Sequence, residues 1–245
     1  MTRSAKPTTA LDFPRPLVTV DIVIFCILED ALKVLLVRRP AEPSDPFPGR
    51  WALPGGFVDV ARDKTLQGCA ARKLAEKTGV STSYLEQLGS WGSADRDPRG
   101  WSATHAFFAL IPAQGVTLQK GANAQEVEWA EAESASRKRL AFDHGEILGA
   151  ALARLRSKVE YTSLPAFLLN EPFTLPQLQR TYEIVLGRPV DKSAFRKRML
   201  DSAFMEEAGM VDGAFGRPAM GYRLRDRSQA TLFPRTFSPR DSAGG

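Results

Sequence analysis

The chain has 245 residues, which is enough for two domains, because domains typically contain about 100 to 200 residues. Its apolar and charged fractions are those of a globular protein and exclude a disordered or fibrous chain. The formal net charge of +5 is compatible with an anionic partner, but only the location of the basic residues can separate such a partner from a simple solubility effect.

The sequence has no feature that favours a membrane or an export route. Its longest apolar run, Ile22 to Leu28, is far shorter than the roughly 20 residues of a membrane helix. Residues 1–16 carry charges and prolines without an apolar signal segment. Cys26 and Cys69 lie in apolar stretches without metal-ligand spacing, so we expect buried thiols in a cytoplasmic protein.

A β-hairpin is the first element expected along the chain. Residues 17–28 (LVTVDIVIFCIL) are rich in β-branched side chains and predict a strand, which the turn Glu29-Asp30 joins to a second strand at 31–39. A proline-rich loop follows at 40–50, and WALPGGFV (51–58) enters another strand and turn.

A helix is predicted at 65–77, where Leu66, Ala70 and Leu74 repeat at i, i+4 and i+8. Further strands are predicted at LGSWG (88–92), ATHAFFALIP (103–112) and VEWAEA (127–132).

A longer helix is predicted from His144 to about Val159. Asp143 and Glu146 have the spacing of a capping box, and one apolar stripe follows. The stripe consists of Ile147, Leu148, Ala151, Leu152, Leu155 and Val159. We therefore expect a flexible arm at 1–16 and a first domain at 17–160, with this helix leading into a second domain.

The second domain is expected at 161–231 and a flexible, Pro-, Ser- and Gly-containing tail at 232–245. Thr174 and Gln177 predict a capped helix that ends at Gly187, and Asp191 begins another helix. Residues 204–224 then predict a hairpin with its tip at 213–218. Two helices followed by a hairpin are the layout of a winged helix-turn-helix.

The second of these helices separates apolar from basic residues. Phe195, Met199 and Ala203 predict a packing stripe, whereas another face carries residues suited to phosphates and base edges. With the hairpin tip, the predicted DNA-binding set is Lys192, Ser193, Arg196, Lys197 and Arg217. A merely solvated basic face is the alternative interpretation.

The segment AARKLAEKTGV (70–80), with WALPGGFVDV before it, resembles the Nudix box, G-x5-E-x7-R-E-U-x-E-E-x-G-U, in which U is aliphatic. Lys73 and Lys77 stand where this pattern has glutamates. Between Gly56 and Arg72 the chain has two residues more than the pattern, so the first glutamate of the pattern has no counterpart, and Arg62 lies near its place. The matching residues are Arg72, Leu74, Glu76, Gly79 and Val80.

The resemblance implies Mg²⁺-dependent hydrolysis of nucleoside diphosphate derivatives. Since Mg²⁺ prefers several carboxylate oxygens, one remaining glutamate predicts lost or very weak catalysis, with no catalytic residue, no metal site and no required cofactor. Two lysines would instead hold a pyrophosphate. The predicted ligand-binding set is Arg38, Arg39, Phe57, Arg72, Lys73, Glu76, Lys77, Arg96 and Arg99. An ordinary Arg72–Glu76 pair on a solvated helix is the alternative for the box.

Residues 96–101 (RDPRGW) are similar to a segment of the ADP-ribose-directed Nudix branch. Together with LAFDHGEIL (140–148) and residues 173–200, they extend the resemblance from Val18 to Leu224, to the NrtR family of Nudix-related transcriptional regulators of NAD metabolism. The resemblance implies an α/β (α+β) fold: a Nudix-like α/β/α sandwich with a mixed sheet, followed by a winged helix-turn-helix.

The same resemblance implies a homodimeric repressor on palindromic double-stranded DNA near genes of NAD biosynthesis or salvage, with ADP-ribose as the effector. Two alternatives stay open. An active hydrolase of ADP-ribose-type substrates would rebuild its metal site from Asp59, Asp63 or Glu86 and release AMP in a Mg²⁺-dependent reaction. A protein-interaction scaffold would bind neither nucleotide nor DNA.

Overall fold

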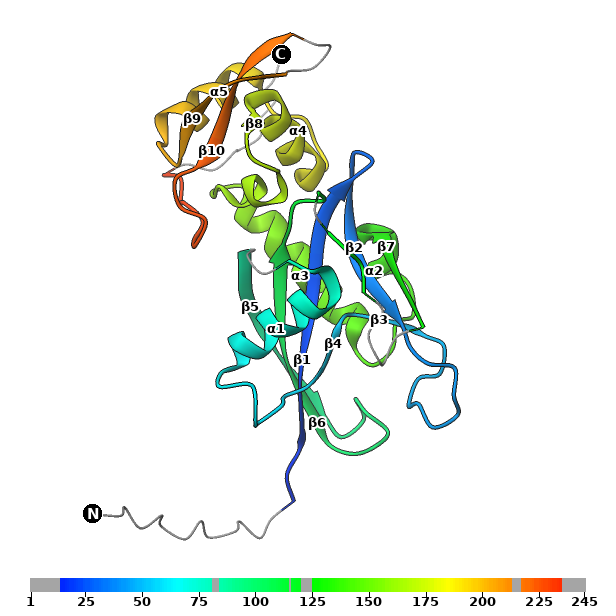
Figure 1. Ribbon diagram of the computed structural model, residues 1–245. Coiled ribbons are helices and arrows are strands. Elements are labelled where there is room, and N and C mark those ends of the chain that lie inside the picture. The colour runs from blue at the N-terminus through cyan, green and yellow to red at the C-terminus, as the bar shows by residue number, and fades with distance from the viewer. Residues whose placement is uncertain (1–13, 81–83, 115, 120–124, 213–216, 235–245) are drawn as a thin grey trace, which may run out of the picture.

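The computed structural model describes residues 14–80, 84–114, 116–119, 125–212 and 217–234. Two domains are connected by the long helix α3 (His144–Val159). Figure 1 shows this helix running from the sheet of the first domain to the helices of the second.

A seven-stranded mixed sheet forms the centre of the first domain. Its strand β1 pairs in parallel with β6 and antiparallel with β2 and β4, while β5 lies outside β6. The strands are β1 (Leu17–Leu28), β2 (Ala31–Arg38), β3 (Trp51–Ala52), β4 (Gly55–Phe57), β5 (Tyr84–Ser93), β6 (Ser102–Leu110) and β7 (Glu126–Glu131).

The expected first hairpin is confirmed. Leu28 pairs with Ala31 across a two-residue turn, and Glu29 and Asp30 have φ angles of 53° and 56°. Two successive positive φ angles match the right-handed twist of the strands that such a turn joins.

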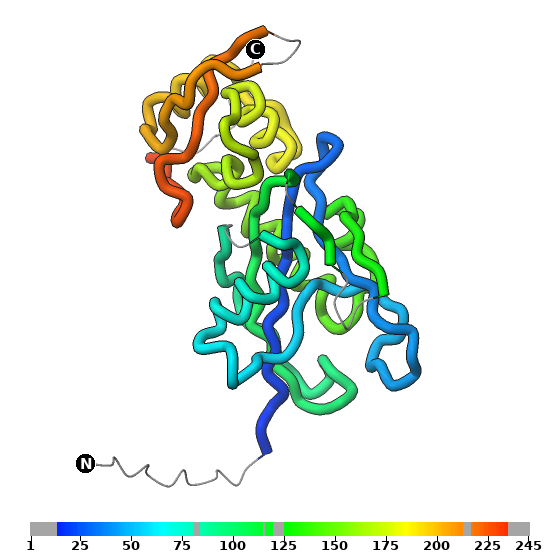
Figure 2. Tube along the Cα trace, viewed as in Figure 1, coloured from blue at the N-terminus to red at the C-terminus, as the bar shows by residue number. Residues whose placement is uncertain are grey.

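Helices cover both faces of the sheet, as Figures 1 and 2 show. Ile22 and Ile24 pack on the face that holds Leu74 of α1 (Leu66–Thr78), whereas Val23 and Phe25 belong to the core on the opposite face. That second face is covered by α3 and the short helix α2 (Ala132–Ser136). The alternation along β1 explains the burial of both faces and confirms the α/β/α sandwich.

The helix α1 begins and ends at the residues that its sequence favours. The Thr65 hydroxyl accepts a 2.9 Å hydrogen bond from the Gly68 N–H, and Gly79 ends the helix at φ 71°. These are the usual roles of threonine at an N-cap and glycine at a C-cap.

The second domain is a winged helix-turn-helix, as expected. It contains a three-stranded sheet of order β8-β10-β9. Its elements are the 3₁₀ helix η1 (Leu164–Leu168), β8 (Phe173–Thr174), α4 (Leu175–Leu186), α5 (Lys192–Asp201), β9 (Met205–Asp212) and β10 (Pro218–Leu224). Of the expected hairpin tip, residues 213–216 lie outside the described residues, and Arg217 and Pro218 are exposed.

Both caps expected in this domain are present. Thr174 and Gln177 form a complete capping box on α4, and the Asp191 carboxylate accepts from the Ala194 N–H at 2.8 Å at the start of α5. Gly187 ends α4 at φ 69°.

The structure corrects two expectations and adds two short helices. Asp143 precedes α3 but makes no side-chain cap bond, because its carboxylate binds Arg96. Ala203 is exposed with φ 50° after the end of α5, so it does not continue the packing stripe of Phe195 and Met199. The short helices α2 and η1 were not expected.

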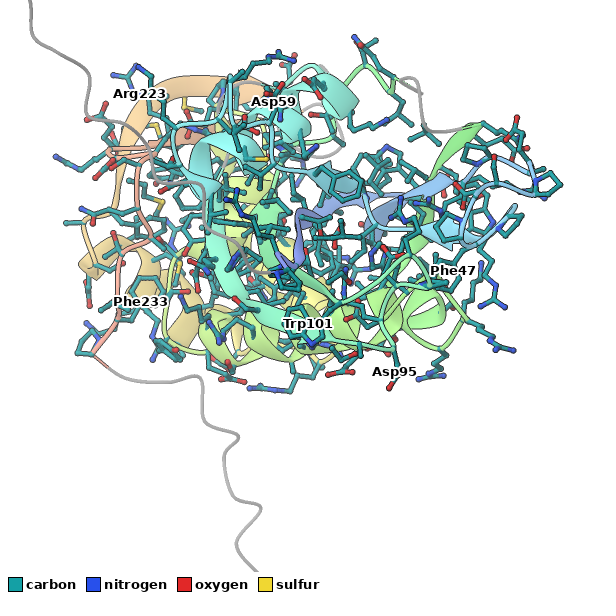
Figure 3. The ribbon with its side chains drawn as sticks, turned by 90° about the horizontal axis from the view of Figure 1, so that it is seen from below. Phe47, Asp59, Asp95, Trp101, Arg223 and Phe233 are labelled. Atoms are coloured by element: carbon teal, nitrogen blue, oxygen red, sulfur yellow. The ribbon has the colours of Figure 1, made fainter. Side chains whose placement is uncertain are left out.

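Part of the expected tail packs against the second domain. Leu232 forms a β-bridge with Thr162, and the buried ring of Phe233 lies 5.8 Å from that of Phe204. Residues 235–245 of that tail and 1–13 of the expected arm lie outside the described residues. Figure 3 shows Phe233 and Phe47 on opposite sides of the molecule in its view.

Candidate functional site

A polar cavity of about 600 Å³ opens in the first domain, a volume in the range of small-molecule sites. Its wall includes residues of β1, β4 and α1 and of the loops that follow β2 and β5. Seven of the nine residues expected to bind ligand line it: Arg39, Phe57, Arg72, Lys73, Lys77, Arg96 and Arg99.

The other two residues of that set lie elsewhere. Arg38 bonds the Gly49 carbonyl at 3.2 Å and the Glu126 carboxylate at 3.0 Å, so its guanidinium is held beside β7. Glu76 accepts from Arg72 and does not line the cavity. Sequence spacing placed both correctly on their elements but not relative to the cavity.

Arginines of the cavity wall already hold carboxylates. Arg39 makes two 2.7 Å bonds to Asp45, and Arg99 makes bonds of 3.0 and 2.7 Å to Asp97. Such fork-shaped pairs combine charge with fixed geometry. They therefore shape the wall, and they neutralise much of the positive charge that we had expected to face phosphates.

Arg72 joins the middle of α1 to the loop before that helix. It bonds Asp63 at 2.8 and 2.7 Å and Glu76 at 2.9 Å. The bond from Arg72 holds the pKa of Asp63 well below its usual range. The Arg72–Glu76 pair of the box is thus a structural contact in this arrangement.

The donors near the cavity do not fit Mg²⁺. Within the described ranges, no group of three or more His, Cys, Asp or Glu side chains is placed to hold a metal ion. Asp63 is committed to Arg72, and Glu86 to Lys158 at 2.5 Å and Arg154 at 3.3 Å. Asp59 lines the cavity, but a hard cation needs several oxygens together.

Two lysines of α1 line the cavity one helical turn apart. The Lys73 ammonium lies 3.1 Å from the position that a Cβ would take on Gly56, so it sits against strand β4. Burial lowers the pKa of Lys77, although Glu76 nearby favours its charged form.

A buried ion-pair network forms the inner wall of the cavity. Arg96, 7% exposed, bonds Asp21 at 2.9 Å and Asp143 at 2.8 and 3.0 Å. Burial raises the pKa of Asp21, but His144 and Arg96 outweigh that effect, and the net pKa lies below the usual value. Arg96 therefore joins β1 to the start of α3.

His144 belongs to the same network. Its Nδ1 accepts a 2.8 Å bond from the Leu53 N–H, which leaves Nε2 as the ring nitrogen that faces the Asp21 carboxylate, at 3.4 Å. Sequence reasoning missed Asp21 and His144 as cavity residues, and Asp143 as the partner of Arg96. The available signal was Asp21, a lone charge inside an apolar strand.

An aromatic cluster closes one side of the cavity. Phe142, with a φ of 52°, packs 4.5 Å from Phe47, and the guanidinium groups of Arg39 and Arg96 lie 5.0 and 5.4 Å from its ring centroid. Phe57 is 46% exposed and has Arg99 at 5.2 Å. Cation–aromatic contacts of this kind add to the carboxylate pairs that hold the same three arginines in place.

The second candidate site is the exposed face of α5. Phe195 and Met199 are buried in the second domain, whereas Lys192, Ser193 and Arg196 are exposed. Lys197 is also exposed and pairs with Asp201 at 3.1 Å. The structure thus brings the predicted α5 residues to one surface.

None of the helices in the described parts of the chain is long and apolar enough to cross a membrane.

Comparison with known proteins identifies both domains. Residues 18–150 match the NUDIX domain, and residues 165–224 match the NrtR DNA-binding winged helix domain. The ADPR responsive transcriptional repressor NtrR of Acinetobacter baylyi is 46% identical over 224 residues, which make up 91% of this chain and 88% of that protein. The chain belongs to the NrtR family.

Solved structures of the NrtR family show the same arrangement. Shewanella oneidensis NrtR complexed with a 27mer DNA is 40% identical, with a TM-score of 0.81 over 90% of this chain and 99% of that chain. The NUDIX domain of the same protein complexed with ADP ribose is 43% identical, with a TM-score of 0.53 over 58% of this chain and 90% of that chain. The NrtR fold expected from the sequence is confirmed.

Proposed function

We propose that this protein is a transcriptional repressor that senses ADP-ribose and controls genes of NAD biosynthesis or salvage. The observation that carries the proposal is a winged helix with an exposed basic α5, joined to a Nudix cavity lined by lysines rather than by metal ligands. NrtR relatives solved with DNA and with ADP ribose support both halves.

The polar cavity is the proposed effector site. A pyrophosphate carries negative charge that Lys73 and Lys77 offset from adjacent turns of α1, and ammonium groups bind phosphate as compact charges. The exposed ring of Phe57 offers an apolar surface for the base. Arg39 and Arg99 keep the cavity wall in shape through their pairs with Asp45 and Asp97. Their remaining N–H groups, which those carboxylates do not use, are available to the effector.

The proposed DNA interface consists of α5 and the β9–β10 hairpin, which we call the reading head. Lys192, Ser193, Arg196 and Lys197 face the groove or its phosphates, and Arg217 lies at the hairpin. The protein acts as a homodimer in this proposal. Two reading heads then match half-sites about 34 Å, or a multiple of it, apart.

We also propose that hydrolysis is absent or marginal. Lys73 and Lys77 place ammonium groups where the Nudix pattern has glutamates, and the nearby carboxylates Asp63 and Glu76 bind Arg72. Turnover of ADP-ribose at about 1 s⁻¹ or faster would contradict this part, because that rate is normal for enzymes. The double variant Lys73→Glu/Lys77→Glu should bind Mg²⁺ more strongly than the unaltered chain.

Calorimetry with ADP-ribose, followed by a DNA shift assay with and without it, tests the proposed function. We expect ADP-ribose to bind and to weaken operator binding. Lys73→Ala/Lys77→Ala should lose most ADP-ribose affinity, while Lys64→Ala, an exposed lysine outside the cavity, should keep it. Hydrolysis of ADP-ribose in the presence of Mg²⁺ would favour the alternative of an active hydrolase. Failure to bind either ADP-ribose or DNA would favour the protein-interaction scaffold.

A further inference from the structure

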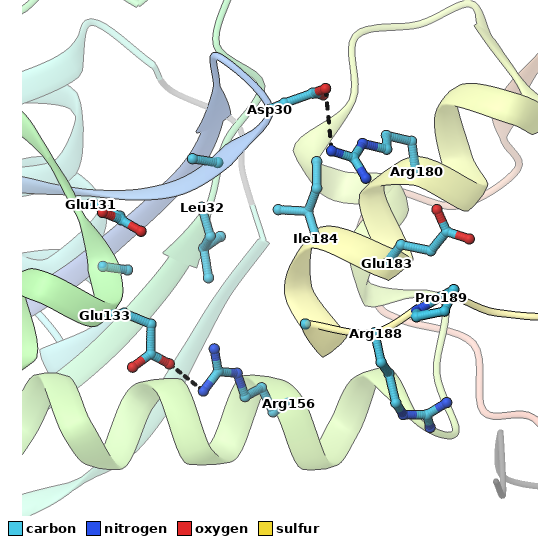
Figure 4. Close-up of a pocket in the computed structure, with 13 residues that line it drawn as sticks. Asp30, Leu32, Glu131, Glu133, Arg156, Arg180, Glu183, Ile184, Arg188 and Pro189 are labelled. Atoms are coloured by element: carbon cyan, nitrogen blue, oxygen red, sulfur yellow. Dashed lines mark hydrogen bonds and ion pairs between the residues drawn. The ribbon is translucent and has the colours of Figure 1, made fainter.

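A cleft of about 450 Å³ lies between the two domains. Figure 4 shows Asp30 and Leu32 of the β1–β2 hairpin on one side and Arg180 and Ile184 of α4 on the other. Arg156 of α3 lies along the third side, where it reaches Glu133 of α2. The cleft is therefore formed by both domains and by the helix that connects them.

Arg156 contacts both domains from α3. Its Nη1 pairs with the Glu133 carboxylate of the first domain, and its Nε donates to the Val185 carbonyl of α4 at 3.2 Å. Val185 lies in the last turn of α4, where carbonyls lack intrahelical partners and a cation is favourable. We call this set of two contacts the Arg156 bridge.

The other end of α3 lies at the effector cavity. His144, its first residue, lines that cavity, and Asp143 before it binds Arg96 of the inner wall. Arg156 follows His144 by twelve residues on the same helix, about 18 Å along its axis. Because a packed helix moves as a unit, a shift at the cavity reaches the Arg156 bridge.

A second contact across the cleft is weaker. Arg180 lies 3.3 Å from Asp30, but both side chains are more than half exposed, and exposed pairs contribute little. The Arg156 bridge differs because one planar guanidinium binds a carboxylate and the end of a helix at the same time. A lysine at this position would keep the positive charge but could not present donors in these two fixed directions.

We propose that Arg156 is a positioning residue that couples the effector cavity to the reading head by setting the angle between α3 and α4. The inference rests on the proposed function, since it needs both ligands. A ligand shifts an equilibrium only when it binds two arrangements with different affinity. The structure described here has the intact bridge, and the second arrangement breaks at least one of its contacts.

The test compares coupling in four variants of the full-length chain. The coupling factor is the operator Kd with saturating ADP-ribose divided by the operator Kd without it, or the reverse if ADP-ribose strengthens binding. We expect a wild-type factor of about 5 to 150. Arg156→Ala, Arg156→Lys and Glu133→Gln should lower it towards 1, because each removes a contact that only one of the two arrangements makes.

Arg154→Ala is the matched control. Arg154 lies on the same helix, but its guanidinium binds Glu86 inside the first domain, so its loss should leave the coupling factor at the wild-type value. If Arg156→Ala does not fold, Arg156→Lys and Glu133→Gln carry the test, because each keeps the size of the side chain.

The outcomes separate this inference from the proposed function. Failure of the unaltered protein to bind ADP-ribose or operator DNA defeats the proposed function. Binding of both without coupling, or a wild-type coupling factor in the Arg156 and Glu133 variants, overturns only the inference. A factor lowered equally in Arg154→Ala also overturns it, because the effect would then come from general damage to α3.

Discussion

At the residue scale, the cavity depends on one buried carboxylate. Asp21 is 5% exposed, and its carboxylate accepts a 2.9 Å hydrogen bond from the Arg96 guanidinium. His144 Nε2 lies 3.4 Å from the same carboxylate. Burying a charge is costly unless a partner and hydrogen bonds compensate it. The three side chains come from β1, the β5–β6 loop and α3, so their network holds these elements in one arrangement.

The stability of the fold is predicted to require glycine at position 55, beside Asp21. A Cβ at this position would lie 2.0 Å from Asp21 Oδ1 and 2.6 Å from the Val20 carbonyl, so Gly55→Ala forces the wall apart. We expect a loss of about 1 to 3 kcal/mol or more in the free energy of unfolding, measured by urea denaturation.

Gly149→Ala is the control for that change. Gly149 is exposed on α3, and a Cβ there meets nothing within 4 Å. Alanine in a helix should stabilise by about 0.5 to 1 kcal/mol. Equal effects of the two substitutions would show that contact with Asp21 does not decide the outcome.

The charge of Asp21 is predicted to stabilise the fold in a pH-dependent manner. Its pKa in the folded state lies below the ordinary 3.8, so the contribution is present above about pH 3.8 and is lost as the pH falls through the folded-state value. Asp21→Asn should cost roughly 1 to 3 kcal/mol at pH 7, because Arg96 still retains Asp143.

Urea denaturation at pH 7, 5 and 3 measures this effect. The difference between wild type and Asp21→Asn should stay constant from pH 7 to 5 and shrink at pH 3. A difference that is the same at all three values would mean that the carboxylate charge makes no net contribution.

At the scale of elements, α5 has two faces with different tasks. Phe195 and Met199 anchor it in the second domain, where the Phe195 ring lies 5.1 Å from that of Tyr182. Arg196 and Lys197 remain on the exposed face. Because the buried face carries the packing, substitutions on the exposed face can change DNA binding while leaving the fold intact.

Arg196→Ala and Lys197→Ala are each predicted to weaken operator binding. Loss of a base contact costs about 1 to 3 kcal/mol of binding free energy and relaxes sequence specificity. Loss of a phosphate contact instead lowers, by about 1, the slope of log K for DNA binding against log salt concentration. Fluorescence anisotropy at several salt concentrations distinguishes the two. Lys138→Ala, an exposed cation of the first domain, should bind like wild type.

Operator affinity that is unchanged in the Arg196→Ala/Lys197→Ala double variant would exclude α5 from the reading head. Thermal unfolding of each variant serves as the check that the domain remains folded.

At the scale of the whole molecule, the two domains share one apolar core. Phe167 of η1 lies 5.1 Å, ring to ring, from Tyr84 of β5, and the cluster of buried side chains continues through α3 into α4. A continuous core transmits a displacement because close-packed interiors deform little. A displacement at the cavity can therefore reach the reading head through packed side chains.

Coupling between the two ligands is predicted to be reciprocal. If ADP-ribose weakens operator binding by some factor, saturating operator must weaken ADP-ribose binding by the same factor, about 5- to 150-fold for typical coupling of 1 to 3 kcal/mol. Calorimetry of ADP-ribose binding with and without operator measures it. Equal ADP-ribose affinities in both conditions would show that the two sites are independent.

Local signals in the sequence predicted most of the elements and their order, but not the short helices α2 and η1. β-branched residues and the turn Glu29-Asp30 identified β1 and β2, and Thr174 with Gln177 identified the start of α4. Such signals are local, since a strand period or a cap involves residues only a few positions apart. The resemblance to the NrtR family added the domain arrangement that these elements adopt.

Which charges face the cavity depends on contacts between residues that are far apart in the chain. Arg96 finds Asp21 across 75 residues and Asp143 across 47, and no local pattern reports such partners. For the same reason Asp143 binds Arg96 instead of capping α3. Local periodicity assigns a residue to an element, whereas the partner of a buried charge is chosen by distance and desolvation in the folded chain.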